Sequence, residues 1–270
     1  MSSIIAKLRG ALALAAFVFV LLLVATPQLY ALLAWHRLAG VQPHRRRKSV
    51  ARWQSAWGVR FFGMISAIMG VRADFRIPPE AACDRPVIAV SNHRSSIDIL
   101  VLFAVLARSG RTDLRWIIKR QLFFAPAIGR SCRETGCAYV ARGGDPGDIS
   151  RVRICAARAH HDDACVMIFP EGTRFTAPRP GSGLAHVLPP KVGGVLALRR
   201  SLPDYPVLSV TIRWTGGPEG RTMFDGESFV GKSVVAECAL HTDLDDRVIA
   251  SWLQEEWRRK DRVIAACARS

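Results

Sequence analysis

The sequence lacks several features that would place it outside the ordinary globular proteins. It has no internal repeat and no proline- or serine-rich linker, which argues against a solenoid and against tethered domains. Its 21 glycines and 15 prolines show no period, so a collagen-like or low-complexity chain is excluded. Hydrophobic residues make up 50% of the 270 positions. A chain this apolar and this long is expected to fold around a core and not to remain disordered.

Paired cysteine motifs are also missing. Seven cysteines are scattered along the chain, at positions 83, 132, 137, 155, 165, 238 and 267. Cys132 and Cys137 are too far apart for a C-x-x-C pair, and no histidine beside them completes a zinc site. We therefore expect small buried thiols in a domain that faces a reducing cytoplasm, with no metal site.

Acidic residues are scarce relative to basic ones. The sequence has 38 Lys and Arg against 22 Asp and Glu, which gives a formal net charge of +16. This surplus favours an anionic partner, either nucleic acid, a membrane surface or a phosphorylated substrate. No nucleic-acid-binding motif and no interleaving of basic and aromatic residues is present, so we expect no nucleic acid among the partners.

The residues from Gly10 to Trp35 carry no charge. As a helix this segment would extend roughly 39 Å at ~1.5 Å per residue, longer than the ~30 Å hydrocarbon core of a bilayer. A cleaved signal peptide is the alternative, with Lys7 and Arg9 as its basic region. The stretch is longer than a usual signal core and lacks an A-x-A site, so we expect an uncleaved anchor.

Both flanks of this segment are basic, and both therefore favour the cytoplasmic side. Lys7 and Arg9 precede the segment, and the run His44–Lys48 follows it. A hairpin-like insertion with Pro27 near the bend would satisfy both flanks, as would a helix that lies partly in one leaflet. The basic run is expected to contact anionic headgroups.

An aromatic stripe follows the basic run. Within residues 49–71, Trp53, Trp57, Phe61 and Ile65 recur with helical spacing, which is typical of an interfacial helix or of a core helix of the soluble domain. We divide the chain into a membrane anchor with a basic juxtamembrane stretch (residues 1–48) and an interfacial helix with a single catalytic domain (residues 49–270).

Beyond residue 80, apolar β-branched runs alternate with amphipathic stretches. This alternation predicts an α/β fold with a largely buried sheet. The expected strands are 86–90, 115–118, 137–140, 165–169, 207–214 and 233–240, and the expected helices are 97–107, 146–160, 192–201 and 245–266. A turn is expected at 216–218, and the polar segment 160–163 is expected to be solvated.

A histidine follows the first of these strands, in the segment Ser91–Asp98. His93 and Asp98 would lie roughly 140° apart on one continuous helix and would not meet. If His93 lies in the loop and Asp98 in the first helical turn, the carboxylate can orient the imidazole as a general base. A capping box, with Ser95 as N-cap and Asp98 three residues later, is the alternative.

A second polar motif, Phe169–Arg174 (FPEGTR), follows another apolar strand. Gly172 permits close approach of the backbone to a ligand. Thr173 and Arg174 offer a hydroxyl and a planar fork of donors, which suit a phosphate monoester. Glu171 would then bind a substrate hydroxyl or orient Arg174. The alternative is a turn at the end of a strand with a surface ion pair.

Together, NHxxxxD and the later FPEGTR resemble the signature of the glycerolipid acyltransferase family. The resemblance runs from about Val87 to the C-terminus. Residues 119–122, Pro126, Gly129 and 139–142 are similar to the family's second block, and residues 186–194, 208–212 and 252–261 are similar to its lysocardiolipin-acyltransferase-like, bacterial inner-membrane branch. The fourth block, an apolar run that ends in a fixed proline, is blurred, which leaves the acceptor open.

The resemblance implies a mixed sheet flanked by helices, with an N-terminal membrane anchor helix. It implies that His93, supported by Asp98, takes the proton of the acceptor hydroxyl as this attacks an acyl thioester. Substrate binding then falls to Glu171, Gly172, Thr173 and Arg174, with Arg142 and Lys119 as further cations on the phosphate side.

The implied reaction transfers a fatty acyl chain from acyl-CoA or acyl carrier protein to a lysophospholipid. The expected acceptor is 1-acylglycerol-3-phosphate, which gives phosphatidic acid. The expected partners are membrane lipids, the lysophospholipid and the thioester, with no cofactor. The expected location is the inner membrane, with the catalytic domain facing the cytoplasm. Another lysophospholipid acceptor, or a non-catalytic lipid-binding protein, is the alternative.

Overall fold

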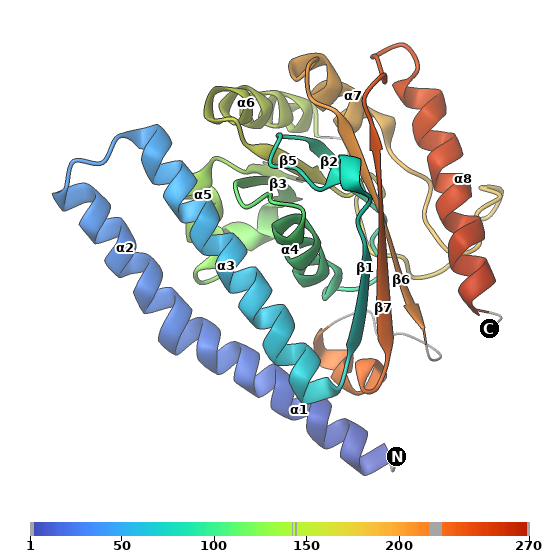
Figure 1. The fold of residues 1–270 in the computed structure, drawn as a ribbon, viewed down its shortest axis with the longest axis horizontal. Coiled ribbons are helices and arrows are strands. Elements are labelled where there is room, and N and C mark those ends of the chain that lie inside the picture. The colour runs from blue at the N-terminus through green and yellow to red at the C-terminus, as the bar shows by residue number, and fades with distance from the viewer. Residues whose placement is uncertain (1–2, 142, 144, 216–222, 269–270) are drawn as a thin grey trace.

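A computed structural model describes residues 3–141, 143, 145–215 and 223–268. The described strands form one seven-stranded sheet in the order β1-β7-β6-β2-β5-β3-β4 (Figure 1). The pair β6–β7 is antiparallel, whereas the other neighbouring strands are parallel. The strands are β1 (Arg72–Arg76), β2 (Ile88–Ser91), β3 (Leu114–Lys119), β4 (Ala138–Val140), β5 (Cys165–Ile168), β6 (Val207–Thr215) and β7 (Ser233–His241). The expected mixed α/β sheet is confirmed.

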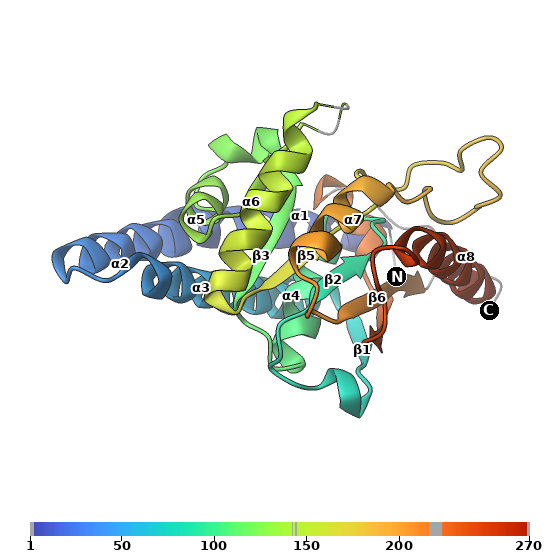
Figure 2. The same ribbon diagram turned by 90° about the horizontal axis from the view of Figure 1, so that it is seen from above.

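Helices cover both faces of this sheet. The N-terminal helices are α1 (Ser3–Val20), α2 (Thr26–Leu38) and α3 (Pro43–Met69), and the later ones are α4 (Asp98–Arg108), α5 (Ile128–Thr135), α6 (Gly147–Asp162), α7 (Val192–Ser201) and α8 (Ile249–Ala268). Short 3₁₀ turns span Pro79–Ala81, Arg120–Phe124 and Met223–Phe229. Figures 1 and 2 show α3 and α4 on one side of the sheet and α6 and α7 on the other.

The side chains of the central strands alternate between two cores. Along β2, Ala89 joins the core beneath α3 and α4, whereas Ile88 and Val90 join the core beneath α6, α7 and α8. Both neighbours of each central strand are strands, and every residue of β2 and β5 is buried. This burial explains why these strands read as continuous apolar runs.

The central strands β2 and β5 are parallel neighbours, and Val90 pairs with Ile168. The segments that follow these two strands therefore leave the sheet at the same edge. The loop 92–97 follows β2 there, and the loop 169–174 follows β5. Two segments nearly eighty residues apart in the sequence are thus brought together by strand pairing.

The first helix is continuous through the proline where a bend was expected. Within the described residues, Ile4–Leu38 is the one helix long and apolar enough to cross a membrane, and 17% of its most apolar stretch is buried. A π-helical turn, Leu21–Ala25, precedes Pro27. Its wider spacing accommodates the proline ring without ending the helix. The chain reverses instead at residues 39–42, where Gly40 has φ +61°.

Helix α1 is packed closely against the sheet domain. A Cβ at Gly10 would lie 2.5 Å from the backbone nitrogen of Glu227, so only glycine permits this approach. The guanidinium of Arg9 donates to the carbonyl oxygen of Ile68 at 2.6 Å. The N-terminal helix is therefore joined to the domain at its start.

Helix α3 contains both the basic run and the aromatic stripe. Arg47 makes a two-pronged bond to Asp162 at the end of α6, with distances of 2.6 and 2.7 Å. Asp162 also accepts from Arg115 at 3.0 Å and is buried. The prediction of a solvated segment at 160–163 is therefore wrong for Asp162, because two arginines from other elements cover it.

Candidate active site

His93 and Asp98 face each other at the end of β2. His93 lies in the loop, Asp98 begins α4, and Nδ1 of the imidazole is 3.3 Å from Oδ2 of the carboxylate. This is the geometry in which a carboxylate fixes the tautomer of a histidine and stabilises its protonated form. Because His93 lies in the loop and not on the helix, the two side chains meet, although the same spacing on one continuous helix would keep them apart.

Asp98 also organises the turn that carries His93. Its Oδ2 atom accepts the backbone N–H groups of Arg94 at 2.6 Å and Ser95 at 2.7 Å. The hydroxyl of Ser95 accepts the N–H of Ile97 at 3.1 Å, and the indole of Trp214 donates to Oδ1 at 3.2 Å. The carboxylate is fully buried. The His93–Asp98 contact is present. Of the expected capping box only the bond from the N–H of Ser95 to Asp98 is present, because α4 begins at Asp98 and its N-cap residue is Ile97, not Ser95.

One nitrogen of the His93 imidazole, Nδ1, is hydrogen-bonded to Asp98, and the other side of the ring borders a pocket. Its ring stacks on Phe169, with the centroids 4.0 Å apart and the planes inclined by 20°. No described residue forms a hydrogen bond with Nε2 of His93, and this side chain lines the pocket that is described below. The second nitrogen is therefore available to a substrate hydroxyl.

Glu171 lies beneath this loop and is not at the surface. It is 1% exposed, and its Oε1 atom accepts the backbone N–H of His93 at 3.1 Å and the indole N–H of Trp257 at 3.3 Å. Oε2 accepts the N–H of Leu188 at 3.2 Å. Burial raises the pKa of Glu171 to about 8, although the three hydrogen bonds that it accepts favour the charged carboxylate. Its partners do not include Arg174.

Of the FPEGTR motif, Phe169, Thr173 and Arg174 line the pocket. Gly172 has φ +73°, and the Lys191 ammonium lies 3.3 Å from the position a Cβ would take there. The guanidinium of Arg174 donates to the hydroxyl of Ser96, in the loop that carries His93. Lys191 is a cation beside Gly172 to which the sequence analysis gave no role.

The two other cations expected on the phosphate side are Lys119 and Arg142. Lys119 is exposed, ends β3 and lines the same pocket. Arg142 lies outside the described residues. The part of the chain that the structure describes holds no group of three His, Cys, Asp or Glu side chains that could bind a metal. The free cysteines are Cys83, Cys132, Cys137, Cys155, Cys165 and Cys238.

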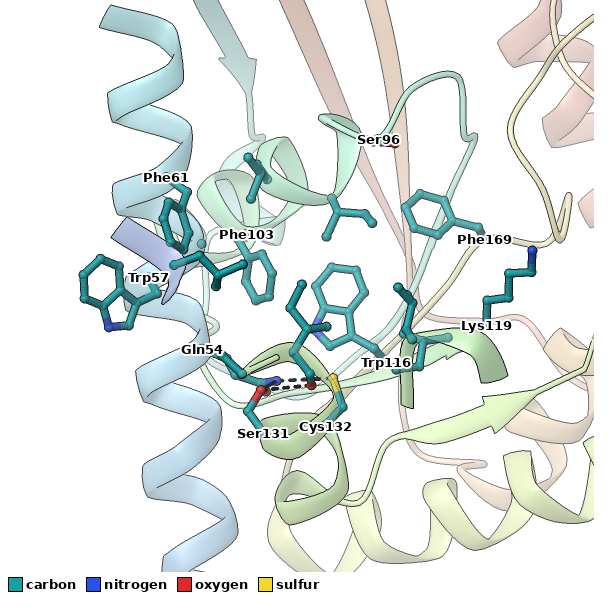
Figure 3. A pocket seen from close by; sticks show the side chains of 18 of the residues that line it. Gln54, Trp57, Phe61, Ser96, Phe103, Trp116, Lys119, Ser131, Cys132 and Phe169 are labelled. Atoms are coloured by element: carbon teal, nitrogen blue, oxygen red, sulfur yellow. Dashed lines mark hydrogen bonds between the residues drawn. The ribbon is translucent and has the colours of Figure 1, made fainter. Parts of the chain in front are cut away.

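An apolar pocket of about 420 Å³ begins at His93 and Arg174. We call it the apolar pocket. Figure 3 shows its wall, to which Trp57 and Phe61 of α3, Phe103 of α4 and Trp116 of β3 contribute. Gln54, Ser131 and Cys132 form a polar group in the same wall. In the sequence, the aromatic stripe was the signal for this wall, but the residues that line the pocket opposite the stripe could not be identified.

Comparisons with known proteins point to one family. The acyltransferase family model matches residues 71–213. The human 1-acyl-sn-glycerol-3-phosphate acyltransferase alpha is 32% identical over 145 residues, which are 53% of this chain and 47% of that protein. The Helicobacter pylori 1-acyl-sn-glycerol-3-phosphate acyltransferase is 30% identical over 124 residues, 46% of this chain and 48% of that protein. The chain thus spans about half the length of the curated relatives it matches.

A solved structure extends the similarity of fold to almost the whole chain. The crystal structure of the Thermotoga maritima 1-acyl-sn-glycerophosphate acyltransferase superposes with a TM-score of 0.64 at 20% identity. It covers 96% of this chain and 98% of that one. The match of the family model to more than half of the chain, together with these relatives, shows that the chain belongs to the glycerolipid acyltransferase family.

Proposed function

We propose that the protein transfers a fatty acyl chain from a thioester to the free hydroxyl of 1-acylglycerol-3-phosphate. The observation that carries this proposal is the position of the His93–Asp98 pair at the mouth of an apolar pocket, beside the guanidinium of Arg174. The pair suits proton transfer, the pocket suits a fatty chain, and the guanidinium suits a phosphate. Relatives named as 1-acyl-sn-glycerol-3-phosphate acyltransferases support the choice of acceptor.

In the proposed mechanism Nε2 of His93 takes the proton of the acceptor hydroxyl. The oxygen forms a bond to the thioester carbonyl carbon, and the carbon–sulfur bond then breaks. The imidazolium returns its proton to the departing thiolate, so that the products are the ester and the free thiol. Asp98 stabilises the imidazolium. No acyl-enzyme forms, and the cysteines have no part in the reaction.

Substrate binding is assigned to the pocket rim. Arg174 and Lys119 hold the acceptor phosphate, and Thr173 with Gly172 shapes the loop around it. Holding the phosphate places the glycerol hydroxyl next to His93, which lowers the entropic part of the barrier. The burial of Glu171 favours a positioning role, through the backbone of His93, over direct contact with substrate.

The membrane arrangement is part of the same proposal. Residues 1–48 anchor the chain in the inner membrane, and residues 49–270 act from its cytoplasmic face on membrane lysophospholipids. The acyl donor is acyl-CoA or acyl carrier protein, and both are acidic. The basic surplus of the chain would attract either one.

The decisive experiment measures transfer of label from acyl-CoA, or from acyl carrier protein, to lysophosphatidate by membranes that contain the protein. Membranes with His93→Ala at equal abundance are the control, and their rate should fall by roughly 10²–10⁴-fold. Other lysophospholipids, tested in parallel, would reveal a different acceptor. Equal rates for the two proteins would contradict the role of His93, and no transfer to any acceptor would favour a non-catalytic lipid-binding protein.

A further inference from the structure

Exposed apolar side chains gather at one place on the catalytic domain. Among the described residues beyond position 48, six large apolar side chains are exposed, and three of them lie within residues 123–128. These three are Phe123, Phe124 and Ile128, and we call them the apolar tip. Phe124 is 85% exposed, so most of its ring lies outside the fold. Single exposed apolar residues are common on protein surfaces, whereas a group of them marks an interaction site.

The apolar tip is held in place by contacts on its inner side. The guanidinium of Arg133 lies over the ring of Phe123, 4.2 Å from its centroid, and donates to the carbonyl oxygen of Phe123 at 2.8 Å. The ring of Tyr139 meets that of Phe123 edge-on, with the centroids 5.3 Å apart, and its hydroxyl donates to the carbonyl oxygen of Gly129 at 2.7 Å. Phe124 meets Phe123 edge-on at 5.2 Å. A packed turn thus presents the ring of Phe124 to the outside.

The apolar tip lies next to the N-terminal anchor. Ala127, in the same turn, is buried and belongs to one apolar cluster with Leu29 and Leu33 of α2. Figures 1 and 2 show α5, which follows the turn, beside the N-terminal helices. The anchor presents exposed apolar side chains of its own, among them Phe19 and Tyr30. Two neighbouring elements therefore expose apolar residues, and the first of them is the segment assigned to the membrane.

The apolar pocket connects these two elements. Its lining includes Phe17 and Leu21 from the anchor, and Leu122 and Ile128 from the turn. A bilayer that contacts both elements would therefore border the pocket in which His93 lies. A lipid acceptor would then reach the general base without leaving the membrane surface.

The charge around the apolar tip favours a lipid surface as its partner. Residues 119–133 contain four basic residues and no acidic one. Lys119 and Arg120, which precede the tip, are both exposed. Basic residues next to a membrane segment are attracted to anionic headgroups, and apolar rings enter the interface between headgroups and acyl chains. Apolar rings with basic residues on both sides in the sequence thus match an anionic bilayer.

We propose that the apolar tip is a second membrane contact, which enters the headgroup layer of an anionic bilayer and orients the catalytic domain on it. This inference rests on the proposed attachment of residues 1–48 to the membrane and does not depend on acyl transfer. The anchor keeps the chain at the membrane, and the tip turns the apolar pocket toward the lipid.

The first test places the photoreactive residue p-benzoylphenylalanine at position 124 of the full chain, in vesicles of phosphatidylethanolamine and phosphatidylglycerol. On irradiation, a benzophenone inserts into nearby C–H bonds, so mass spectrometry of the protein detects lipid adducts. Phe124→p-benzoylphenylalanine should form lipid adducts with a yield comparable to that of the same change at Phe19 in the anchor. Val248→p-benzoylphenylalanine is the matched control and should form few. Val248 is also exposed and apolar, but it precedes α8, which Figure 1 shows remote from α2.

The second test measures what the contact does for turnover. Phe124→Ser should lower kcat/KM for a long-chain lysophosphatidate in vesicles by about 10-fold, the effect of burying roughly half of a phenylalanine side chain. The value for hexanoyl lysophosphatidate, which is dissolved in water, should not change, because Phe124 does not line the apolar pocket. Val248→Ser should retain both values. An equal loss with both acceptors would overturn the orienting role of the tip.

The photochemical outcomes separate this inference from the proposed function. Lipid adducts at position 19 without adducts at position 124 overturn the second contact, however active the protein is. Equal yields at positions 124 and 248 overturn it too, and so do adducts at position 124 that join two copies of the chain. Absence of adducts at all three positions would overturn the membrane attachment itself. If no acceptor is acylated, the adduct yields still decide, since they need no turnover.

Discussion

The backbone N–H of His93 donates a hydrogen bond to the side chain of Glu171, with 3.1 Å between the nitrogen and Oε1. The two residues belong to different motifs and are 78 positions apart. Because Glu171 also binds the indole of Trp257 on α8, the loop of the proposed general base is tied to the last helix of the chain. Each element of this connection can be removed separately.

Glu171→Gln should lower kcat by about 10-fold and leave both KM values little changed. The amide oxygen can still accept from His93 and Trp257, but the amide nitrogen meets the N–H of Leu188, so one bond is lost. Glu171→Leu removes all three acceptor contacts and should cost more. Steady-state kinetics of both variants, at equal amounts of folded protein, measure this. A large rise in acceptor KM for Glu171→Gln would indicate substrate contact instead.

Glu171 should also make the stability of the fold depend on pH. Burial raises its pKa from 4.5 to about 8, so the folded protein holds this proton more tightly than the unfolded chain. Stability from this group is therefore full below pH 4.5 and is lost as pH rises through 8, by at most about 1.4 kcal/mol per pH unit.

Unfolding of the unaltered protein and of Glu171→Gln between pH 5 and 9 checks this slope. The stability of the unaltered protein should fall relative to that of the variant as pH rises. Groups shared by both proteins largely cancel. Lys260, whose pKa burial lowers to about 8, cancels only in part, because the charge of Glu171 acts to raise that pKa. Parallel curves would show that Glu171 stays ionised in the folded state.

Asp98→Asn should reduce both activity and stability, because the carboxylate orients His93 and accepts two backbone N–H groups. We expect kcat to fall, though less than in His93→Ala, and the free energy of unfolding to fall by about 1 kcal/mol. Asp245→Asn is the control. Asp245 accepts the backbone N–H groups of Arg247 and Val248 just before α8, and it does not line the pocket. It should lose stability but retain kcat. A normal kcat per folded molecule in Asp98→Asn would leave only the capping role.

Trp257→Phe should lower kcat by several-fold without raising either KM. The substitution removes the indole N–H that binds Oε1 of Glu171, and the ring is fully buried. Trp252→Phe on the same helix is the matched control, since Trp252 packs against His241 and not against the site. Kinetics and thermal unfolding of both variants distinguish the two effects. If Trp252→Phe impairs turnover equally, general loosening of α8 is the explanation.

Arg174→Lys should raise the KM of the acceptor more than it lowers kcat. Lysine keeps the charge but loses the planar fork that donates to the hydroxyl of Ser96 and to which we assign the acceptor phosphate. Arg174→Ala should impair both constants, because a misplaced hydroxyl reacts slowly. Arg179→Lys, at an exposed position in the same segment, is the control. A rise confined to the donor KM would reassign the phosphate site to the thioester.

The local pattern of the sequence determined most of the secondary structure. The apolar run 165–169 became β5, and the amphipathic run 192–201 became α7 with the same bounds. Strand β1 was missed because it is short, charged at both ends and mostly exposed at the edge of the sheet. Helix α5 was missed because it is only eight residues long and contains a glycine. A hydrophobic pattern indicates which residues of an element are buried, and short elements or strands at the edge of a sheet bury few residues.

The sequence by itself also determined the two motifs, their position after buried strands and the family they indicate. Only the tertiary structure decided what each residue contacts. It placed Glu171 beneath His93, brought Asp162 between two arginines, and turned the aromatic stripe of α3 into one wall of a pocket. The physical reason is that backbone conformation responds to neighbouring residues, whereas burial and charge pairing depend on strands and helices that are distant in the chain.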